Sequence, residues 1–109
     1  MKLKFGIPCS KIKNRLKDVE VNCTSEEQAL AIAAGCHLAG EEAEVYMQNS
    51  GLCRCVDVAL SLYKPYEIPL PKLLLSLRHK PYHHSFCGKV TKRLLTMMGW
   101  KNVEIVEQK

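Results

Sequence analysis

Two adjacent carboxylates, Glu26 and Glu27, follow Thr24 and Ser25 and open an apolar stretch, a pattern typical of the start of a helix. The helix dipole favours acidic residues in the first turn, so both glutamates have an ordinary structural explanation. A capping box between Thr24 and Glu27 would use Glu27 for structure and leave Glu26 free to point toward a site. We therefore expect Glu26 to be the carboxylate that does chemistry.

Further polar side chains follow other apolar segments. Gln48, Asn49 and Ser50 come directly after one of them, and Asn and Ser are common in turns because they hydrogen-bond their own backbone. Arg78 either binds an anion or faces solvent. The simplest interpretation of His84 is that it is an exposed histidine in a loop. His37, inside an apolar helix, is expected to be buried or at an interface.

The cysteines do not have the spacing of a metal site. The closest pair is separated by one residue, whereas zinc sites use Cys-x-x-Cys pairs. Most of the cysteines lie in apolar stretches, where free thiols behave as small hydrophobic side chains. We expect structural thiols and no metal site from the six cysteines, which are Cys9, Cys23, Cys36, Cys53, Cys55 and Cys87.

Strand-like and helix-like segments alternate along the chain. Strands are expected near residues 2–8, 19–23, 44–48, 68–77 and 103–106, and helices over 10–16, 24–39, 52–63 and 86–98. Residues 49–51 are expected to form a turn, and Gly40 and Gly99 to end helices. The order predicts one α/β domain over residues 1–109, with three layers and a mainly parallel sheet of about five strands.

In such sheets, ligands bind outside the carboxyl ends of the strands. That rule places residues 8–10, 24–27, 48–52 and 77–84 along one edge, and these segments carry the unusual polar residues. The chain has neither the G-x-G-x-x-G of dinucleotide-binding folds nor the G-x-x-x-x-G-K-[ST] of P-loop proteins. The sequence therefore argues against ordinary dinucleotide and P-loop phosphate binding.

The same segments resemble, in order and over nearly the whole chain, the pyrimidine-binding domain of the sulfopyruvate and phosphonopyruvate decarboxylases. These enzymes use thiamine diphosphate. The most specific piece is Gln-Asn-Ser-Gly-Leu after a strand. The matching pieces are Gly6-Ile7-Pro8-Cys9-Ser10, Thr24-Ser25-Glu26-Glu27-Gln28-Ala29, Met47-Gln48-Asn49-Ser50-Gly51-Leu52, Tyr66-Glu67-Ile68-Pro69 and His84-x-x-x-Gly88-x-x-Thr91-x-x-Leu94-Leu95.

The resemblance implies a thiamine-diphosphate-binding fold and a role for Glu26. In the family a glutamate hydrogen-bonds a ring nitrogen of the cofactor's aminopyrimidine and so activates the cofactor. Substrate contacts by Arg78 and His84 are also implied. The chain departs from the family at Cys53 and Arg54, where Gly and Asn are usual. The cofactor-binding positions implied are Pro8, Ser10, Gln48, Asn49, Ser50, Gly51 and Leu52.

The resemblance also implies a partner. Thiamine enzymes hold the diphosphate through Mg²⁺ with a Gly-Asp-Gly motif and a later Asn, and this chain has no such motif. A diphosphate-binding, beta-type subunit would have to supply it. The helix from Glu26 to Ala39 is apolar around most of its circumference, so it is expected either at that interface or in the interior of the monomer.

The expected activity is that of an oligomeric sulfopyruvate-decarboxylase-alpha-like subunit acting on an acidic 2-oxoacid, as in coenzyme M biosynthesis. A non-catalytic interaction or regulatory subunit is the alternative. The termini are basic, with six Lys/Arg in residues 1–17 and nine in 64–109, which would also suit nucleic acid. Few aromatic residues accompany these charges, so we favour a solvated surface. With no long apolar run or leader pattern, we expect a cytoplasmic protein.

Overall fold

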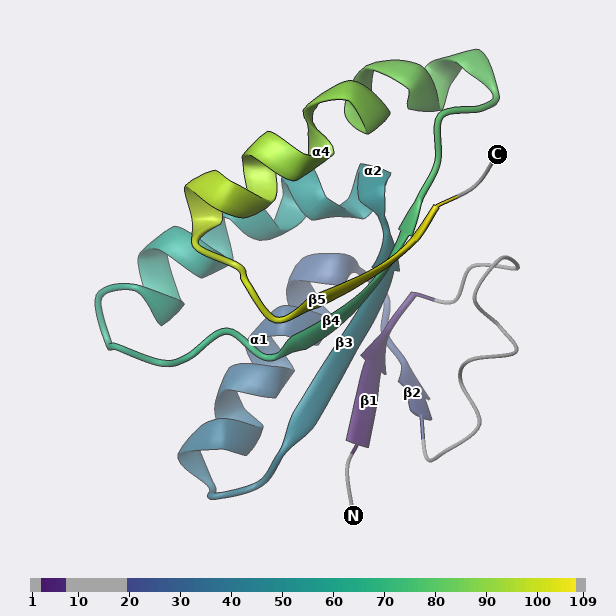
Figure 1. The fold of residues 1–109 in the computed structure, drawn as a ribbon. Helices are drawn as coiled ribbons and strands as arrows, with labels where there is room; N and C mark the ends of the chain where they lie inside the picture. The colour runs from purple at the N-terminus through teal and green to yellow at the C-terminus, as the bar shows by residue number, and fades with distance from the viewer. Residues whose placement is uncertain (1–2, 8–19, 108–109) are drawn as a thin grey trace.

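The computed structural model describes residues 3–7 and 20–107, which form one α/β unit (Figure 1). All neighbouring strands are parallel, and the order across the sheet is β2-β1-β3-β4-β5. This confirms the expected α/β class and the parallel sheet of five strands. The helix predicted over residues 10–16 lies outside the described residues. The strands are β1 (Leu3–Gly6), β2 (Glu20–Asn22), β3 (Ala43–Gln48), β4 (Lys72–Leu77) and β5 (Val103–Glu107).

Among the described residues, three helical segments connect strands, and the core residues show that they cover the same face of the sheet. The first segment is α1 (Glu26–Leu38). The second is continuous and consists of α2 (Asn49–Leu52), η2 (Cys53–Cys55), α3 (Val56–Val58) and η3 (Ala59–Tyr63). The third is α4 (Ser85–Met98), which follows the short helical turn η4 (Tyr82–His84). None of the helices in the described residues is long and apolar enough to cross a lipid bilayer.

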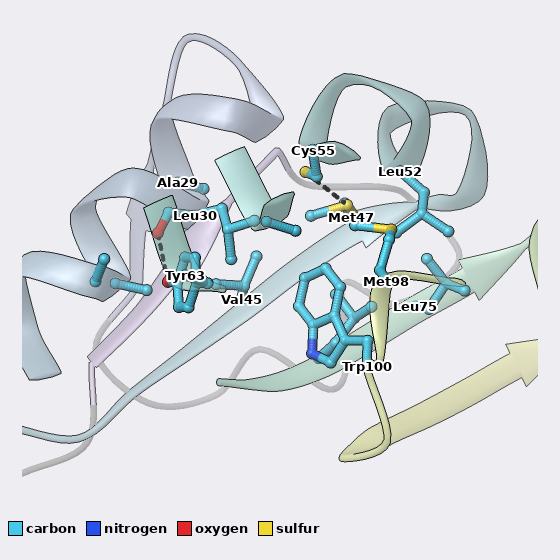
Figure 2. Close-up of a cluster of buried hydrophobic side chains, with 14 of the residues drawn as sticks. Ala29, Leu30, Val45, Met47, Leu52, Cys55, Tyr63, Leu75, Met98 and Trp100 are labelled. Atoms are coloured by element: carbon cyan, nitrogen blue, oxygen red, sulfur yellow. Dashed lines mark hydrogen bonds between the residues drawn. The ribbon is translucent and has the colours of Figure 1, made fainter. Parts of the chain in front are cut away.

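The core lies between these helices and one face of the sheet (Figure 2). Val45 and Met47 of β3 point into it, and the intervening Tyr46 faces the other side of the sheet with Leu74 and Val106. Within the core, the Tyr63 hydroxyl donates a 2.6 Å hydrogen bond to the Leu30 carbonyl, which ties η3 to α1.

Element boundaries follow local signals where the sequence contains strong ones. Gly40 and Gly99 have φ angles of 82° and 70°, a left-handed conformation that glycine adopts readily at helix ends. β4 begins directly after Pro71, because proline cannot donate to a central ladder.

Two settings were expected for helix α1, an interface or the interior of the monomer, and the described chain does not enclose it. Ala29, Leu30, Ala33 and Ala34 are buried, but the opposite side is exposed. Leu38, at the end of the helix, is 73% exposed. The apolar circumference is therefore not explained by packing within the described chain. The exposed side carries Ala31, Ile32, Gly35 and Leu38, which we call the outer face of α1.

Candidate functional site

The start of α1 positions Glu26, but the cap differs from the expected one. Ser25, not Thr24, is the N-cap, and its Oγ accepts a hydrogen bond from the Gln28 backbone N–H at 3.2 Å. The Gln28 side-chain oxygen reaches back to the Thr24 N–H at 2.8 Å and to the Thr24 hydroxyl at 3.0 Å. Gln28 therefore makes the contacts at this helix start, and the expected capping box between Thr24 and Glu27 is not formed.

Glu26 lies directly against Gly51, which belongs to the segment after β3. A Cβ atom added at Gly51 would lie 2.3 Å from Glu26 Cγ and 2.4 Å from its carboxyl carbon. Any other residue at this position would therefore displace the carboxylate. The absence of a side chain at Gly51 creates the space that the Glu26 side chain fills.

One cation approaches the two glutamates. Arg54 Nε lies 3.9 Å from Glu26 Oε1, and Arg54 Nη1 lies 4.0 Å from Glu27 Oε1. The Arg54 side chain is 64% exposed and that of Glu26 only 14%, so this pair contributes about 1 kcal/mol at most. Among the described residues, Glu27 Oε1 is buried without a hydrogen-bond partner. No hydrogen bond to the Glu26 carboxylate comes from the described part of the chain.

Asn49 has a structural role that the expected turn did not anticipate. Helical backbone begins at Asn49 itself, so the predicted turn over residues 49–51 is wrong. The buried Asn49 amide accepts a hydrogen bond from the Arg78 N–H at 3.0 Å and donates to the Arg78 carbonyl at 3.1 Å. It also donates to the Thr91 hydroxyl at 3.3 Å. Both ends of the amide are thus occupied within the chain.

The other residues of this segment divide between surface and core. The Gln48 amide donates to the Ser50 hydroxyl at 2.9 Å, and its oxygen lies 3.4 Å from Arg78 Nη1. These three polar side chains join the ends of β3 and β4. Leu52, in contrast, is fully buried in the core, so its side chain faces away from the edge (Figure 2).

His84 is buried, at 6% exposure, so the expectation of an exposed loop histidine was wrong. Burial lowers its pKa, and the neighbouring His83 and Arg78 lower that pKa further. The His83 and His84 rings lie 4.1 Å apart, and His84 Nδ1 has no hydrogen-bond partner in the described part of the chain. His84 therefore stays neutral near pH 7 and lies within electrostatic reach of Arg78.

The segment His84-x-x-x-Gly88-x-x-Thr91 docks α4 onto the sheet edge. A Cβ atom at Gly88 would lie 2.8 Å from the Arg78 carbonyl oxygen and 2.4 Å from His79 Nδ1. Thr91 contacts Asn49, as described above. Because these residues recur at intervals of four and three, they share one helix face, and that spacing is the sequence signal for a docking face.

The candidate residues thus form two groups at the carboxyl edge. Glu26 and Gly51 meet beside β1, with Arg54 outside them, and Arg78 and His84 lie beyond the end of β4. Gln48 and Ser50 lie between the groups. Pro8 and Ser10 lie outside the described residues. Sequence reasoning did not identify the contacts that Gln28, Gly88 and Thr91 make.

Other features of the chain lie away from this edge. A cavity of about 300 Å³ opens at the opposite edge of the sheet, with His37, Glu44, Pro71 and Lys72 in its lining. His37 is exposed rather than buried in the monomer. In residues 3–7 and 20–107, no group of three or more His, Cys, Asp or Glu side chains could hold a metal ion.

No protein-family model matches the chain, but curated relatives do. It is 38% identical over 82 residues to sulfopyruvate decarboxylase subunit alpha of Methanocaldococcus jannaschii, covering 69% of this chain and 47% of the relative. It is 37% identical over 76 residues to the subunit alpha of Methanothermobacter thermautotrophicus, covering 63% of this chain and 46% of the relative. It is 38% identical over 72 residues to the Methanosarcina acetivorans protein named sulfopyruvate decarboxylase, covering 62% of this chain and 19% of the relative.

The chain spans about half the length of the two subunit-alpha relatives. It covers less than one fifth of the Methanosarcina protein, 19% of its length. The similarity confirms the resemblance to the alpha subunits that the ordered motifs indicated.

Proposed function

We propose that this chain, a homologue of sulfopyruvate decarboxylase alpha subunits over the matched residues, supplies the pyrimidine-binding part of a thiamine-diphosphate-dependent 2-oxoacid decarboxylase. Its substrate would be an acidic 2-oxoacid of the sulfopyruvate type. The names of the matched relatives support the reaction class. The enzyme would act with a second, diphosphate-binding subunit.

The observation that carries the proposal is the position of the Glu26 carboxylate over Gly51. The strand order is that of a doubly wound sheet whose direction of growth reverses between β1 and β3. Ligands bind in the crevice at such a reversal. Glu26 follows β2 and Gly51 follows β3, so the two residues meet beside the end of β1.

The residues present fit the aminopyrimidine of the cofactor. The Glu26 side chain is 14% exposed, and the cation that approaches its carboxylate among the described residues is Arg54, at 3.9 Å. It is therefore shielded from bulk water yet still available to a polar ligand atom. Glu26 would hold a proton at the ring nitrogen, and Gly51 would keep the carboxylate in position. Thiamine diphosphate, when bound, would supply the electron sink for the electron pair that remains when carbon dioxide leaves.

Magnesium and the diphosphate would be held by the partner subunit. The Methanosarcina relative supports this division of labour, because the matched region is a minor part of a longer polypeptide. The outer face of α1, formed by Ala31, Ile32, Gly35 and Leu38, is the apolar surface that we assign to the partner.

Substrate selection would lie with Arg78 and His84. Guanidinium groups bind sulfonate and carboxylate oxygens with charge-assisted hydrogen bonds. Arg78 is half-buried, and the Gln48 side chain positions its guanidinium at 3.4 Å. His84, kept neutral by its surroundings, would contribute a hydrogen bond rather than a charge.

One observation favours a second candidate function, a non-catalytic subunit that retains the fold. Arg54 stands where the family usually has asparagine, and its guanidinium lies against both glutamates. An arginine in that position competes with a cofactor nitrogen for the Glu26 carboxylate. In this alternative the chain would bind its partner without binding cofactor.

The two functions are separated by calorimetry of thiamine diphosphate and Mg²⁺ against the chain mixed with its diphosphate-binding partner. For Glu26→Gln we expect retained partner binding with turnover of a 2-oxoacid reduced by at least about 100-fold. Glu27→Gln is the matched control, since it changes the adjacent carboxylate, and should keep turnover within a few fold. Full activity of Glu26→Gln would refute the assigned role.

Absence of cofactor binding in the wild-type mixture, with intact partner binding, would support the non-catalytic alternative. Arg54→Asn then tests whether the arginine prevents cofactor binding. Cofactor binding that appears only in this variant would identify Arg54 as the blocking group.

A further inference from the structure

The longest stretch of the chain without an acidic residue runs through α4. Residues 68–103 contain seven Lys or Arg and no Asp or Glu. Three of these cations, Lys89, Lys92 and Arg93, are exposed on α4. In the part of the chain that the structure describes, none of the three forms an ion pair. Their positive charge is therefore available to a negatively charged partner.

Two exposed aromatic rings lie at the start of the same helix. Tyr82 of η4 is 77% exposed, and Phe86 of α4 is 59% exposed. The two ring centroids lie 5.6 Å apart in an edge-to-face arrangement, and Lys89 Nζ lies 5.3 Å from the centroid of Phe86. Few aromatic residues accompany the basic residues along the sequence, but in the fold these two rings adjoin the cations of α4.

Helical spacing places these residues on the side of α4 that faces away from the core. Phe86, Lys89 and Arg93 follow one another at intervals of three and four residues, so they share one side of the helix. The buried residues, among them Leu95 and Met98, lie on the opposite side and pack into the core. We call the exposed set the basic face of α4, and its residues are Tyr82, Phe86, Lys89, Lys92 and Arg93.

The composition of this face discriminates between three classes of anionic partner. A lipid surface takes up the apolar side of an amphipathic helix, but in α4 that side is already buried in the core. An acidic protein would pair with the cations and leave the two exposed rings without a role. A single-stranded nucleic acid uses both kinds of residue, because its phosphates pair with Lys and Arg and its bases stack on aromatic rings.

We propose that the basic face of α4 binds single-stranded nucleic acid. The phosphates contact Lys89, Lys92 and Arg93, and the bases stack on Tyr82 and Phe86. Charge complementarity selects the class of partner, since the acid-free stretch holds no carboxylate that would repel a phosphate. Stacking does not recognise base edges, so we expect little sequence preference. This binding requires neither the partner subunit nor thiamine diphosphate.

The test is fluorescence anisotropy of the full chain with a labelled single strand of about twelve thymidines, over a range of salt concentrations. Each phosphate contact to a single strand contributes about 0.7 to the slope of log Kd against log salt, so three contacts predict a slope of about 2. A uridine RNA of the same length should bind within a few fold. The corresponding duplex should bind at least about fivefold more weakly, because its bases are already stacked.

Substitution of one ring tests the stacking contact. Tyr82→Leu keeps an apolar side chain and removes the ring, so affinity for the single strand should fall by at least about fivefold while the salt slope remains unchanged. Tyr66→Leu is the matched control, because Tyr66 is 72% exposed and lies outside η4 and α4. The control should bind as the wild type does.

Substitution of one cation tests the phosphate contacts. Arg93→Gln should lower the salt slope by about 0.7, since one contact is lost. Lys72→Gln makes the same change in net charge at the start of β4, beside the cavity at the opposite sheet edge, and should keep the wild-type slope. Arg93, Lys72 and the two tyrosines are all exposed, and circular dichroism of each variant confirms that it is folded.

The proposal is overturned if the single strand is not bound at low salt, or if Tyr82→Leu binds it as tightly as the wild type does. Binding of heparin as tightly as the single strand would indicate recognition of charge alone and would also overturn it. Binding of polyglutamate, or of vesicles of equimolar phosphatidylcholine and phosphatidylserine, without binding of the single strand would assign this face to an acidic protein or a membrane instead.

Discussion

At the scale of single residues, Gly51 sets the position of the Glu26 carboxylate. In Gly51→Ala the added Cβ would occupy space that Glu26 now fills, at 2.3 Å from its Cγ. Because the Glu26 side chain is flexible and Gly51 has helical backbone, we expect the carboxylate to move while the fold remains. Calorimetry with partner and thiamine diphosphate should show cofactor affinity reduced by at least about tenfold, that is, by at least 1.4 kcal/mol.

Gly35→Ala is the matched control for this variant. Gly35 also lies in a helix, and a Cβ there meets no atom within 4 Å. The isolated chain should gain up to about 1 kcal/mol of stability from Gly35→Ala, since glycine is unfavourable inside helices and the added Cβ meets no atom. An unchanged cofactor affinity in Gly51→Ala would contradict the role that we assign to the Glu26–Gly51 contact.

At the scale of elements, the Asn49 side chain joins β3, β4 and α4. Asn49→Ala removes three hydrogen bonds from a buried site and leaves the Arg78 N–H and carbonyl without their partner. We expect the free energy of unfolding in urea to fall by about 3 kcal/mol. Ser50→Ala, which removes a neighbouring hydroxyl that is only half-buried, should cost less than about 1 kcal/mol. Equal losses in the two variants would contradict a bridging role for Asn49.

The same residue shows why parts of the structure could not be read from the sequence. Asn49-Ser50-Gly51 has the composition of a turn, but its backbone is helical because Asn49 bonds a strand end twenty-nine residues away. Local composition contains no information about that partner. The cap of α1 is similar, since Thr24 and Ser25 are equivalent as local signals and only the position of Gln28 distinguishes them.

Elements with strong local signals were predicted well. Gly40 and Gly99 end their helices with positive φ, and Pro71 precedes β4. The alternation of strands and helices predicted the parallel sheet, and with it the edge along which Glu26, Gln48 and Arg78 lie. Hydrophobic periodicity could not show that the outer face of α1 is exposed, because it reports apolar character and not the presence of a covering surface.

At the scale of the whole molecule, His84 makes stability depend on pH. Its pKa in the folded chain is lowered by burial, then by His83 and Arg78, whereas in the unfolded chain it is near 6.5. Below pH 6.5 the unfolded chain binds a proton that the folded chain does not, so stability falls as pH decreases toward the folded pKa. Well above pH 6.5, where His84 is neutral in the unfolded chain too, this residue adds no pH dependence.

As pH decreases below 6.5, we expect the melting temperature of His84→Gln to fall less steeply than that of the wild type. His37→Gln, a substitution of an exposed histidine, should keep the wild-type slope. The measurement is thermal unfolding across that pH range. If the His84→Gln and wild-type curves are parallel, the burial of His84 has no consequence for acid stability.

The Asn49–Arg78 contact has a further consequence for how this corner of the sheet can vary. The Asn49 side-chain amide donates to and accepts from the backbone of Arg78, as a peptide group would. It therefore adds one more pair of hydrogen bonds beyond the end of the β3–β4 ladder. A corner closed by a side chain can be widened or narrowed by exchanging one residue, without inserting or deleting any. Point substitution at position 49 can therefore change the spacing of this corner while the strand register remains unchanged.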